Sequence, residues 1–258
     1  MVLAGAVALA LQSVYAADIT VNQGEMYETD IIGEDNTTSL NNMGTVNNEK
    51  IVIHGGTFKN TGVIETGTLD LFVGGSAQNN NLGGDITADD EIIFRGFYTG
   101  ATTQTAEVKA QLNTRKLSII GTDVYRSGLK FFSTESLQGV EEIYAESNGQ
   151  RTGLWLHADA GEKIRYDGTV TLVSTVNKDD ARIEVDAGAG QSASIYVDTV
   201  VSDDSGKGAS NKLQTTHASE TSLVFEVGHI IVESGKLNLQ TSGTMNNLSF
   251  ATIFTNKR

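Results

Sequence analysis

Adjacent acidic side chains are the groups in this 258-residue sequence that could most directly do chemistry. They occur as Asp89-Asp90-Glu91, Glu141-Glu142, Asp179-Asp180 and Asp203-Asp204. Carboxylates set close together can bind calcium, and a pair of them can act as acid and base in cleaving a carbohydrate. These groups flank apolar runs in the way that turn residues do, so we expect them to be solvated corners of the fold.

Histidine and glycine motifs add no further site. The histidines are His54, His157, His217 and His229, and we expect them to be surface residues because none has a neighbour at metal-ligand spacing. Residues Gly188–Ala193 match a GxGxxA dinucleotide pattern, but a β run follows where that motif requires a helix. Gly83-Gly84-Asp85 is only a fragment of a calcium-binding nonapeptide. We therefore assign no catalytic, cofactor-binding or metal-binding residue and expect no cofactor.

Aromatic side chains gather in the middle of the chain, between residues 94 and 166. They are Phe94, Phe97, Tyr98, Tyr125, Phe131, Phe132, Tyr144, Trp155 and Tyr166. Most such residues fill a core, whereas exposed ones can stack on sugar rings or contact another protein. If the molecule has a binding face, the sequence predicts it here.

Composition excludes several classes of protein. The chain has no cysteine and no proline, which rules out disulfides, thiolate metal sites and a cysteine nucleophile. With 32 acidic and 18 basic side chains it carries a formal charge of -14. Nucleic acid is therefore not an expected partner, because phosphate binding needs clustered Lys and Arg.

Short β runs must position these groups. Twelve candidate strands, separated by Gly, Asn, Asp and Ser, cover residues 18–22, 50–54, 68–73, 91–95, 116–120, 129–132, 154–157, 169–174, 182–186, 194–201, 223–233 and 236–240. Residues 106–112 and 134–145 could instead form short helices on loops. No linker divides the chain, so we expect one all-β domain.

A weak internal repeat indicates how the strands are arranged. Gly44–Asn48 recurs twelve residues later as Gly56–Asn60, and related phrases begin at Gly67, Gly168 and Gly235. A turn glycine followed by alternating polar and apolar residues is typical of a parallel β-solenoid with about 20 to 25 residues per coil. We expect corner asparagines to stack in hydrogen-bonded ladders, with Asn47, Asn48, Asn60 and Asn79–Asn81 as the candidates.

The first residues are typical of an export signal. Residues Val2–Leu11 are apolar apart from glycine, and Val14-Tyr15-Ala16 places small residues where signal peptidase requires them. We expect a signal peptide over residues 1–16, and the domain over residues 17–258. Since signal peptides open with positive charge and the first basic residue is Lys50, we expect the true start upstream of Met1. No later run is long and apolar enough for a membrane helix.

Two phrases complete a family resemblance. They are G-T-F-x-N-x-G-x-I over Gly56–Ile64 and S-G-x-L-N-L over Ser234–Leu239. With the signal and the absence of cysteine and proline, they make the chain similar to the passenger of a Gram-negative autotransporter. That resemblance implies a right-handed parallel β-helix of the pectin-lyase-like kind, displayed at the cell surface by an outer-membrane translocator barrel. No barrel sequence is present, so we expect either truncation at Arg258 or a resemblance limited to the solenoid.

The resemblance and the lack of catalytic motifs together favour a non-enzymatic protein of the cell surface, outer membrane or extracellular space. We expect it to act in adhesion or in host and matrix interaction, with a host glycan or protein surface as its partner. Two alternatives stay open. One is a polysaccharide lyase or hydrolase on the same scaffold, with Asp179 and Asp180 as its carboxylates. The other is a structural stalk for a missing domain.

Overall fold

The computed structural model describes residues 18–34, 38–72, 81–96, 98–99, 104–159, 161–175, 180–187, 193–204, 210–216, 223–242 and 254–256. Within these ranges the chain forms strands, turns and bends and contains no helix, which confirms the all-β prediction. Several of the residues singled out above lie outside the described ranges, namely residues 1–16, Asn79, Asn80, Phe97, Asp179, Gly188–Gly190 and His217.

Two parallel sheets run along the whole molecule. Sheet A follows the order β1 (Asp18–Val21), β4 (Ser39–Asn42), β6 (Phe58–Asn60), β8 (Asn81–Leu82), β11 (Gln104–Val108), β13 (Ser127–Phe131), β15 (Thr152–Ala158), β17 (Ala181–Ala187), β19 (Asn211–Thr216) and β21 (Leu237–Ser242). Sheet B follows β2 (Met26–Tyr27), β5 (Thr45–His54), β7 (Val63–Phe72), β9 (Asp85–Arg95), β12 (Gln111–Gly121), β14 (Gly139–Ser147), β16 (Lys163–Ser174), β18 (Ala193–Asp203), β20 (Leu223–Ser234) and β22 (Phe254–Asn256). Short strands β3 (Ile31–Gly33) and β10 (Tyr98–Thr99) add to β5 and β11.

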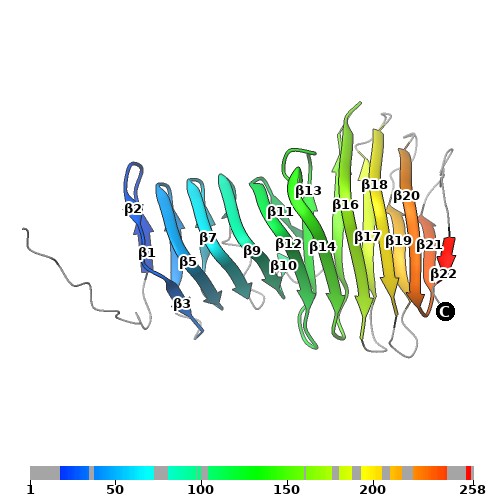
Figure 1. Ribbon diagram of the computed structural model, residues 1–258, viewed down its shortest axis with the longest axis horizontal. Coiled ribbons are helices and arrows are strands. Elements are labelled where there is room, and N and C mark those ends of the chain that lie inside the picture. The colour runs from blue at the N-terminus through cyan, green and yellow to red at the C-terminus, as the bar shows by residue number, and fades with distance from the viewer. Residues whose placement is uncertain are drawn as a thin grey trace, which may run out of the picture.

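The chain passes from one sheet to the other and back, so each circuit stacks on the one before it. Every pairing along the two sheet orders is parallel, and only β10 pairs antiparallel, with β11. The strands lie across the long axis of the rod (Figure 1). The predicted β-solenoid is confirmed, while its right-handedness stays a prediction.

Coil length is not constant along the rod. Residues that stack on successive coils are 18 positions apart at Asn42 and Asn60, and 23 apart at Asp70 and Ile93. The separation reaches 31 positions at Asp203 and Ser234. The sequence predicted about 20 to 25 residues per coil. The coils therefore exceed that range in the C-terminal half, and the separation falls again to 24 positions between Ile230 and Phe254.

The core is a set of apolar columns between the sheets. Successive strand residues point to opposite faces of a sheet, and stacking in register places the inward residue of each coil on that of the next. One column of sheet B consists of Ile51, Leu69, Ile92, Leu117, Ile143, Val170, Val200 and Ile230, all of them buried. Burying each such side chain contributes roughly 1.5 to 3 kcal/mol, which makes these columns the main stabilising element.

Neither candidate helix forms. Residues 106–112 enter β11 and β12, with Ala106, Val108, Ala110 and Leu112 all buried. A spacing of four fits period two as well as a helix, and burial at every second residue shows that the strand period holds. Residues 134–138 form bends and turns, and residues 139–145 belong to β14, where Ile143 and Ala145 point into the core.

An asparagine ladder exists, with one predicted member and one new partner. The buried Asn42 side chain donates from Nδ2 to Oδ1 of Asn60 at 2.8 Å, and Asn60 Nδ2 donates to the Gly83 carbonyl oxygen at 2.7 Å. The prediction was wrong for Asn47 and Asn81, which are exposed. Asn48 bonds the Thr29 carbonyl oxygen rather than another asparagine. The repeat at Gly44 and Gly56 is likewise not a coil period, because its two copies begin strands of different sheets.

Candidate functional site

Most of the described acidic pairs lie at the outer surface. Asp89, Asp90 and Glu141 are exposed, as expected for solvated corners. Glu91 and Glu142 are partly exposed on the outside of sheet B, where Glu91 Oε1 lies 3.4 Å from Lys116 Nζ. Among the described residues, no group of three or more His, Cys, Asp or Glu side chains could hold a metal ion.

Asp180 contradicts the corner interpretation. Its side chain is 2% exposed and forms ion pairs with the buried Arg182 and with Lys212, whose Nζ lies 2.6 Å from Oδ2. Burial alone would raise the pKa of Asp180, but hydrogen bonds from Arg182 and Lys212 hold that pKa below its ordinary value. Asp204 is also buried. Asp180 is therefore committed to structure and is not open to a polymer substrate.

His157 is the one described histidine held on both sides. His54 packs edge-on against Phe72, and His229 is exposed. His157 Nδ1 lies 2.6 Å from Asp186 Oδ1, and its Nε2 lies 3.1 Å from Asp159 Oδ1. Both nitrogens thus face carboxylates of the chain itself, which orient the ring. This arrangement depends on stacking between coils, and no local sequence pattern indicates it.

His157 belongs to a cluster that we call the aromatic surface, made up of Lys130, Phe132, Trp155, His157 and Asp186. The His157 ring meets the Phe132 ring at 5.4 Å between centroids, and Lys130 Nζ lies 5.3 Å from the Phe132 centroid. Lys130 Nζ also lies 3.2 Å from Asp186 Oδ2. Trp155 pairs in register with Lys130. These contacts join Lys130, Phe132, His157 and Asp186, and Trp155 lies next to Lys130 on the neighbouring strand.

The register of sheet A explains why these residues meet. In β13 and β15 the inward positions are Leu129, Phe131, Leu154 and Leu156, all buried, so the alternate residues face outward. In β15 and β17, His157 pairs directly with Asp186. The side chains of Lys130, His157 and Asp186 are 21%, 18% and 27% exposed, so the surface is partly open to solvent.

The other predicted aromatics divide between the core and the surface. Phe94, Phe131 and Tyr166 are buried in the core cluster. Tyr125 is exposed at a corner, and Tyr144 lies partly exposed on the outside of sheet B. The Tyr144 hydroxyl donates a hydrogen bond to the Glu146 carboxylate at 3.0 Å. Burial is the largest cause, and this hydrogen bond the next, of a rise in the pKa of Tyr144 to about 12. Only the exposed members of this set are therefore available for the predicted binding face.

A cleft opens in sheet B between β14 and β16. These strands pair from Glu142 and Thr169 onward, whereas β16 already pairs with β18 from Lys163. Residues 163–166 of β16 therefore pair with β18 on one side and do not pair with β14 on the other. On the other side the Thr134 hydroxyl spans part of the gap, accepting a hydrogen bond from the Arg165 amide at 3.0 Å. A long coil stacked on a shorter one leaves this opening in the ladder.

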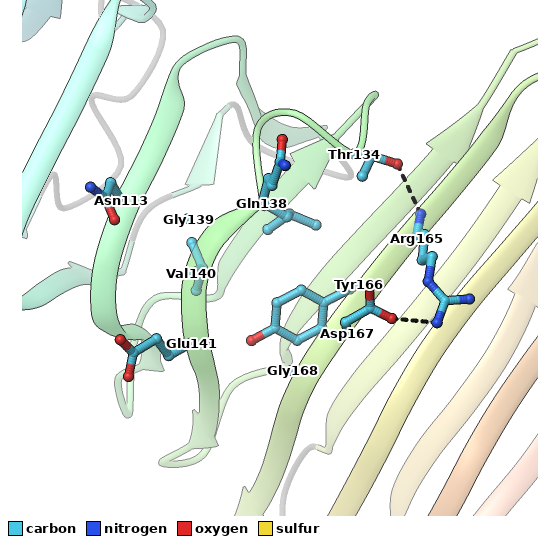
Figure 2. Close-up of a pocket in the computed structure, with 11 residues that line it drawn as sticks. Asn113, Thr134, Gln138, Gly139, Val140, Glu141, Arg165, Tyr166, Asp167 and Gly168 are labelled. Atoms are coloured by element: carbon cyan, nitrogen blue, oxygen red, sulfur yellow. Dashed lines mark hydrogen bonds and ion pairs between the residues drawn. The ribbon is translucent and has the colours of Figure 1, made fainter.

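The cleft has a volume of about 580 Å³ and is lined mainly by polar groups. Its lining consists of Asn113, Thr134, Leu137, Gln138, Gly139, Val140, Glu141, Arg165, Tyr166, Asp167 and Gly168. Arg165 Nη2 lies 2.6 Å from Asp167 Oδ1, and its guanidinium stacks on Tyr196 at 4.1 Å. Figure 2 shows the Tyr166 ring between these groups and the β14 strand.

Tyr166 is the unusual group of the cleft. Its side chain is 2% exposed, and its hydroxyl has no hydrogen-bond partner among the described residues. Burial, and then the nearby Glu142 and Glu141 carboxylates, raise the pKa of Tyr166 above its ordinary range, so the phenol stays protonated. A Cβ at Gly168 would clash with this hydroxyl and with the Glu141 carbonyl oxygen. Glycine at that position makes room for the phenol.

Comparison with known proteins gives no assignment. No protein-family model, curated protein or solved structure matches the chain. In the part of the chain that the structure describes, no helix is long and apolar enough to cross a membrane.

Proposed function

We propose that the protein is a non-enzymatic β-solenoid of the cell surface or extracellular space that acts in adhesion, binding a host glycan or protein through the aromatic surface. The observation that carries this proposal is the packing of Phe132, Trp155 and His157 beside Lys130 and Asp186 on one face of sheet A. Aromatic side chains with adjacent charges are typical of the energetic centre of binding surfaces. Because contacts among these side chains already hold them in place, less conformational entropy is lost when a ligand binds.

The proposal includes membership of the autotransporter passengers, with a signal peptide over residues 1–16 and display by an outer-membrane barrel. The β-solenoid fold supports it. The positions in the fold of the two sequence phrases that carry the resemblance also support it. Gly56–Ile64 spans β6 and the start of β7, and Ser234–Leu239 spans the corner before β21 and its start. Recovery of the flanking gene sequence tests this part, since a barrel downstream supports it and its absence contradicts it.

A non-enzymatic role is supported by the state of the two groups best suited to catalysis. Asp180 is buried in its ion pairs, and both nitrogens of His157 face carboxylates. A general base needs a free nitrogen or oxygen within reach of the substrate.

Binding to immobilised mucin, glycan arrays and host-cell matrix tests the adhesion proposal. Trp155→Ala should weaken binding by more than about tenfold, because truncating an aromatic anchor removes a large share of binding energy. Tyr144→Ala on sheet B is the matched control and should bind like the wild type. If the wild type binds no more than an equally acidic control protein, the proposal is wrong.

A further inference from the structure

The cleft between β14 and β16 holds a polar group that the folded chain does not satisfy. A buried hydroxyl without a partner is costly, and the great majority of buried polar groups are hydrogen-bonded. Tyr166 is 2% exposed, its hydroxyl lacks a partner among the described residues, and it lies in the lining of a hollow of about 580 Å³. A hollow of this size is within the range of small-molecule sites.

We propose that the cleft binds a single neutral saccharide unit, whose hydroxyl group pairs with the Tyr166 hydroxyl. This site lies on sheet B and is distinct from the aromatic surface of sheet A. The inference goes beyond the proposed function and does not depend on it.

The charge of the lining excludes an anionic ligand. The cleft contains one base, Arg165, and two acids, Glu141 and Asp167. Arg165 is already engaged by the Asp167 carboxylate and by the Tyr196 ring. Glu141 is exposed at the rim and adds negative charge. A carboxylate or phosphate would be repelled by the net negative charge of the lining. The Arg165 guanidinium, which could otherwise pair with such a group, is already engaged.

The hydrogen-bonding groups match sugar hydroxyls. A neutral phenol can donate and accept, and Tyr166 stays protonated. The side-chain amides of Asn113 and Gln138 offer both donors and acceptors, and Glu141 offers acceptors only. A ligand that meets all of them must itself donate and accept at several adjacent points, which vicinal hydroxyls do. Leu137 and Val140 supply an apolar floor for the C–H face of a ring.

The opening of the ladder supplies the shape. Because β14 and β16 pair only from Glu142 and Thr169 onward, the cleft widens away from that point towards Thr134. Figure 2 shows the Tyr166 ring beside β14, with its hydroxyl towards Gly168 and Glu141. Because the Tyr166 hydroxyl has almost no exposed surface, a ring that enters the cleft must displace a lining side chain to bring one of its own hydroxyls to the phenol.

The test is ligand-observed saturation-transfer NMR on the full chain, with affinities from calorimetry. The neutral probes are glucose, galactose, mannose and N-acetylglucosamine, and the charged probes are glucuronic acid and glucosamine. We expect at least one neutral sugar to bind, and glucuronic acid to bind at least about tenfold more weakly. If none of the neutral sugars binds, the proposal is wrong, and a buried water is the partner of the Tyr166 hydroxyl. Preferential binding of glucosamine, lost in Glu141→Gln, overturns it in favour of a cation site.

Tyr166→Phe separates binding from folding. The substitution removes one oxygen that has no partner in the chain, so the melting temperature should stay equal or rise. Sugar affinity should fall by more than about tenfold. Tyr144→Phe is the matched control, because the hydroxyl it removes lies on the outer face and bonds Glu146. Equal affinity of Tyr166→Phe and the wild type would overturn the proposal.

Trp155→Ala distinguishes this site from the aromatic surface. Sugar binding in the cleft should be unchanged in Trp155→Ala, and mucin or matrix binding should be unchanged in Tyr166→Phe. Loss of both activities in either variant would show a single site and contradict the assignment to the cleft. Far-UV circular dichroism of each variant confirms that the solenoid has formed.

Discussion

The two ends of the solenoid hold the polar groups of sheet A in different ways. Near the N-terminal end, the last residues of β4 and β6 form a neutral ladder from Asn42 to Asn60. Near the C-terminal end, the start of β17 and of β19 adds buried charges, with Asp180 against Arg182 and Lys212, to the neutral hydrogen bonds of Asn211. The first arrangement joins coils 18 positions apart. In the second, Arg182 reaches Gln214 at a separation of 32 positions.

The difference shows how coil length changes the chemistry of a corner. In a short coil an amide stacks on the amide of the next coil and satisfies it without any charge. A longer coil places side chains of different kinds beside one another, and a buried carboxylate there needs cations from its own coil and from the next one. Burying a charge costs free energy, and this cost becomes a loss of stability when one partner of a buried ion pair is removed. The C-terminal corner should therefore be more sensitive to substitution and to pH.

The largest expected effect is that of Asp180→Asn. It removes the closer of the two carboxylates that pair with the buried Arg182 and leaves Glu184 at 3.8 Å, so we expect a loss of roughly 3 to 5 kcal/mol in the free energy of unfolding. Urea unfolding followed by circular dichroism measures it. Asp90→Asn is the control, because Asp90 is exposed in its ion pair with Arg115 and should contribute less than about 1 kcal/mol. Equal effects of the two variants would contradict the comparison.

The next expected effect is that of Asn60→Ala. It removes one of the two acceptors of the buried Asn42 amide, the other being the Val63 carbonyl oxygen, so we expect a loss of about 1 to 3 kcal/mol. Asn81→Ala removes an exposed amide of the next coil and should lie within about 0.5 kcal/mol of the wild type. A loss for Asn60→Ala as large as that for Asp180→Asn would remove the distinction between the two ends.

Acid should weaken the C-terminal corner and leave the asparagine ladder unaffected. The pKa of Asp180 is lowered in the folded state, so its contribution to stability is present above the ordinary aspartate pKa of about 3.9. That contribution is lost as the pH falls below this value towards the lowered pKa. The urea midpoints of the wild type and Asp180→Asn should therefore converge as the pH is lowered. The gap between the wild type and Asn60→Ala should not narrow in the same way.

The smallest expected effect is that of Lys130→Met on the aromatic surface. The ion pair with Asp186 is partly exposed, so the change in stability should be within about 1 kcal/mol. A loss comparable to that of Asp180→Asn would show that sheet A is stabilised by charge at its outer face as well as at its corner.

Hydrophobic alternation allowed most of the fold to be predicted. Residues such as Ile51, Leu117 and Val170 lie in predicted strands, and each of them is buried in the apolar column of sheet B. The first halves of β5, β7, β9, β12 and β16 were not predicted. There the strand bends at a shift of register, as between Thr66 and Thr68 and between Tyr166 and Thr169, and turn-like residues interrupt the alternation.

The sites could not be predicted because they depend on register between coils of unequal length. His157 and Asp186 are 29 positions apart, and no local pattern relates them. Asp180 looked like a corner acid because the cation from the next coil, Lys212, lies far along the chain. The cleft at Tyr166 follows from a partial mismatch of two stacked strands, which a degenerate repeat does not encode.

The separation between stacked residues also has a consequence for folding. Ladder partners lie 18 to 31 positions apart along the solenoid, so the contact order is roughly a tenth of the chain length. Each coil needs only its predecessor as a template, and the closure entropy is that of one coil rather than of the whole chain. Structure can therefore grow coil by coil, and the short N-terminal coils have the smallest loops to close.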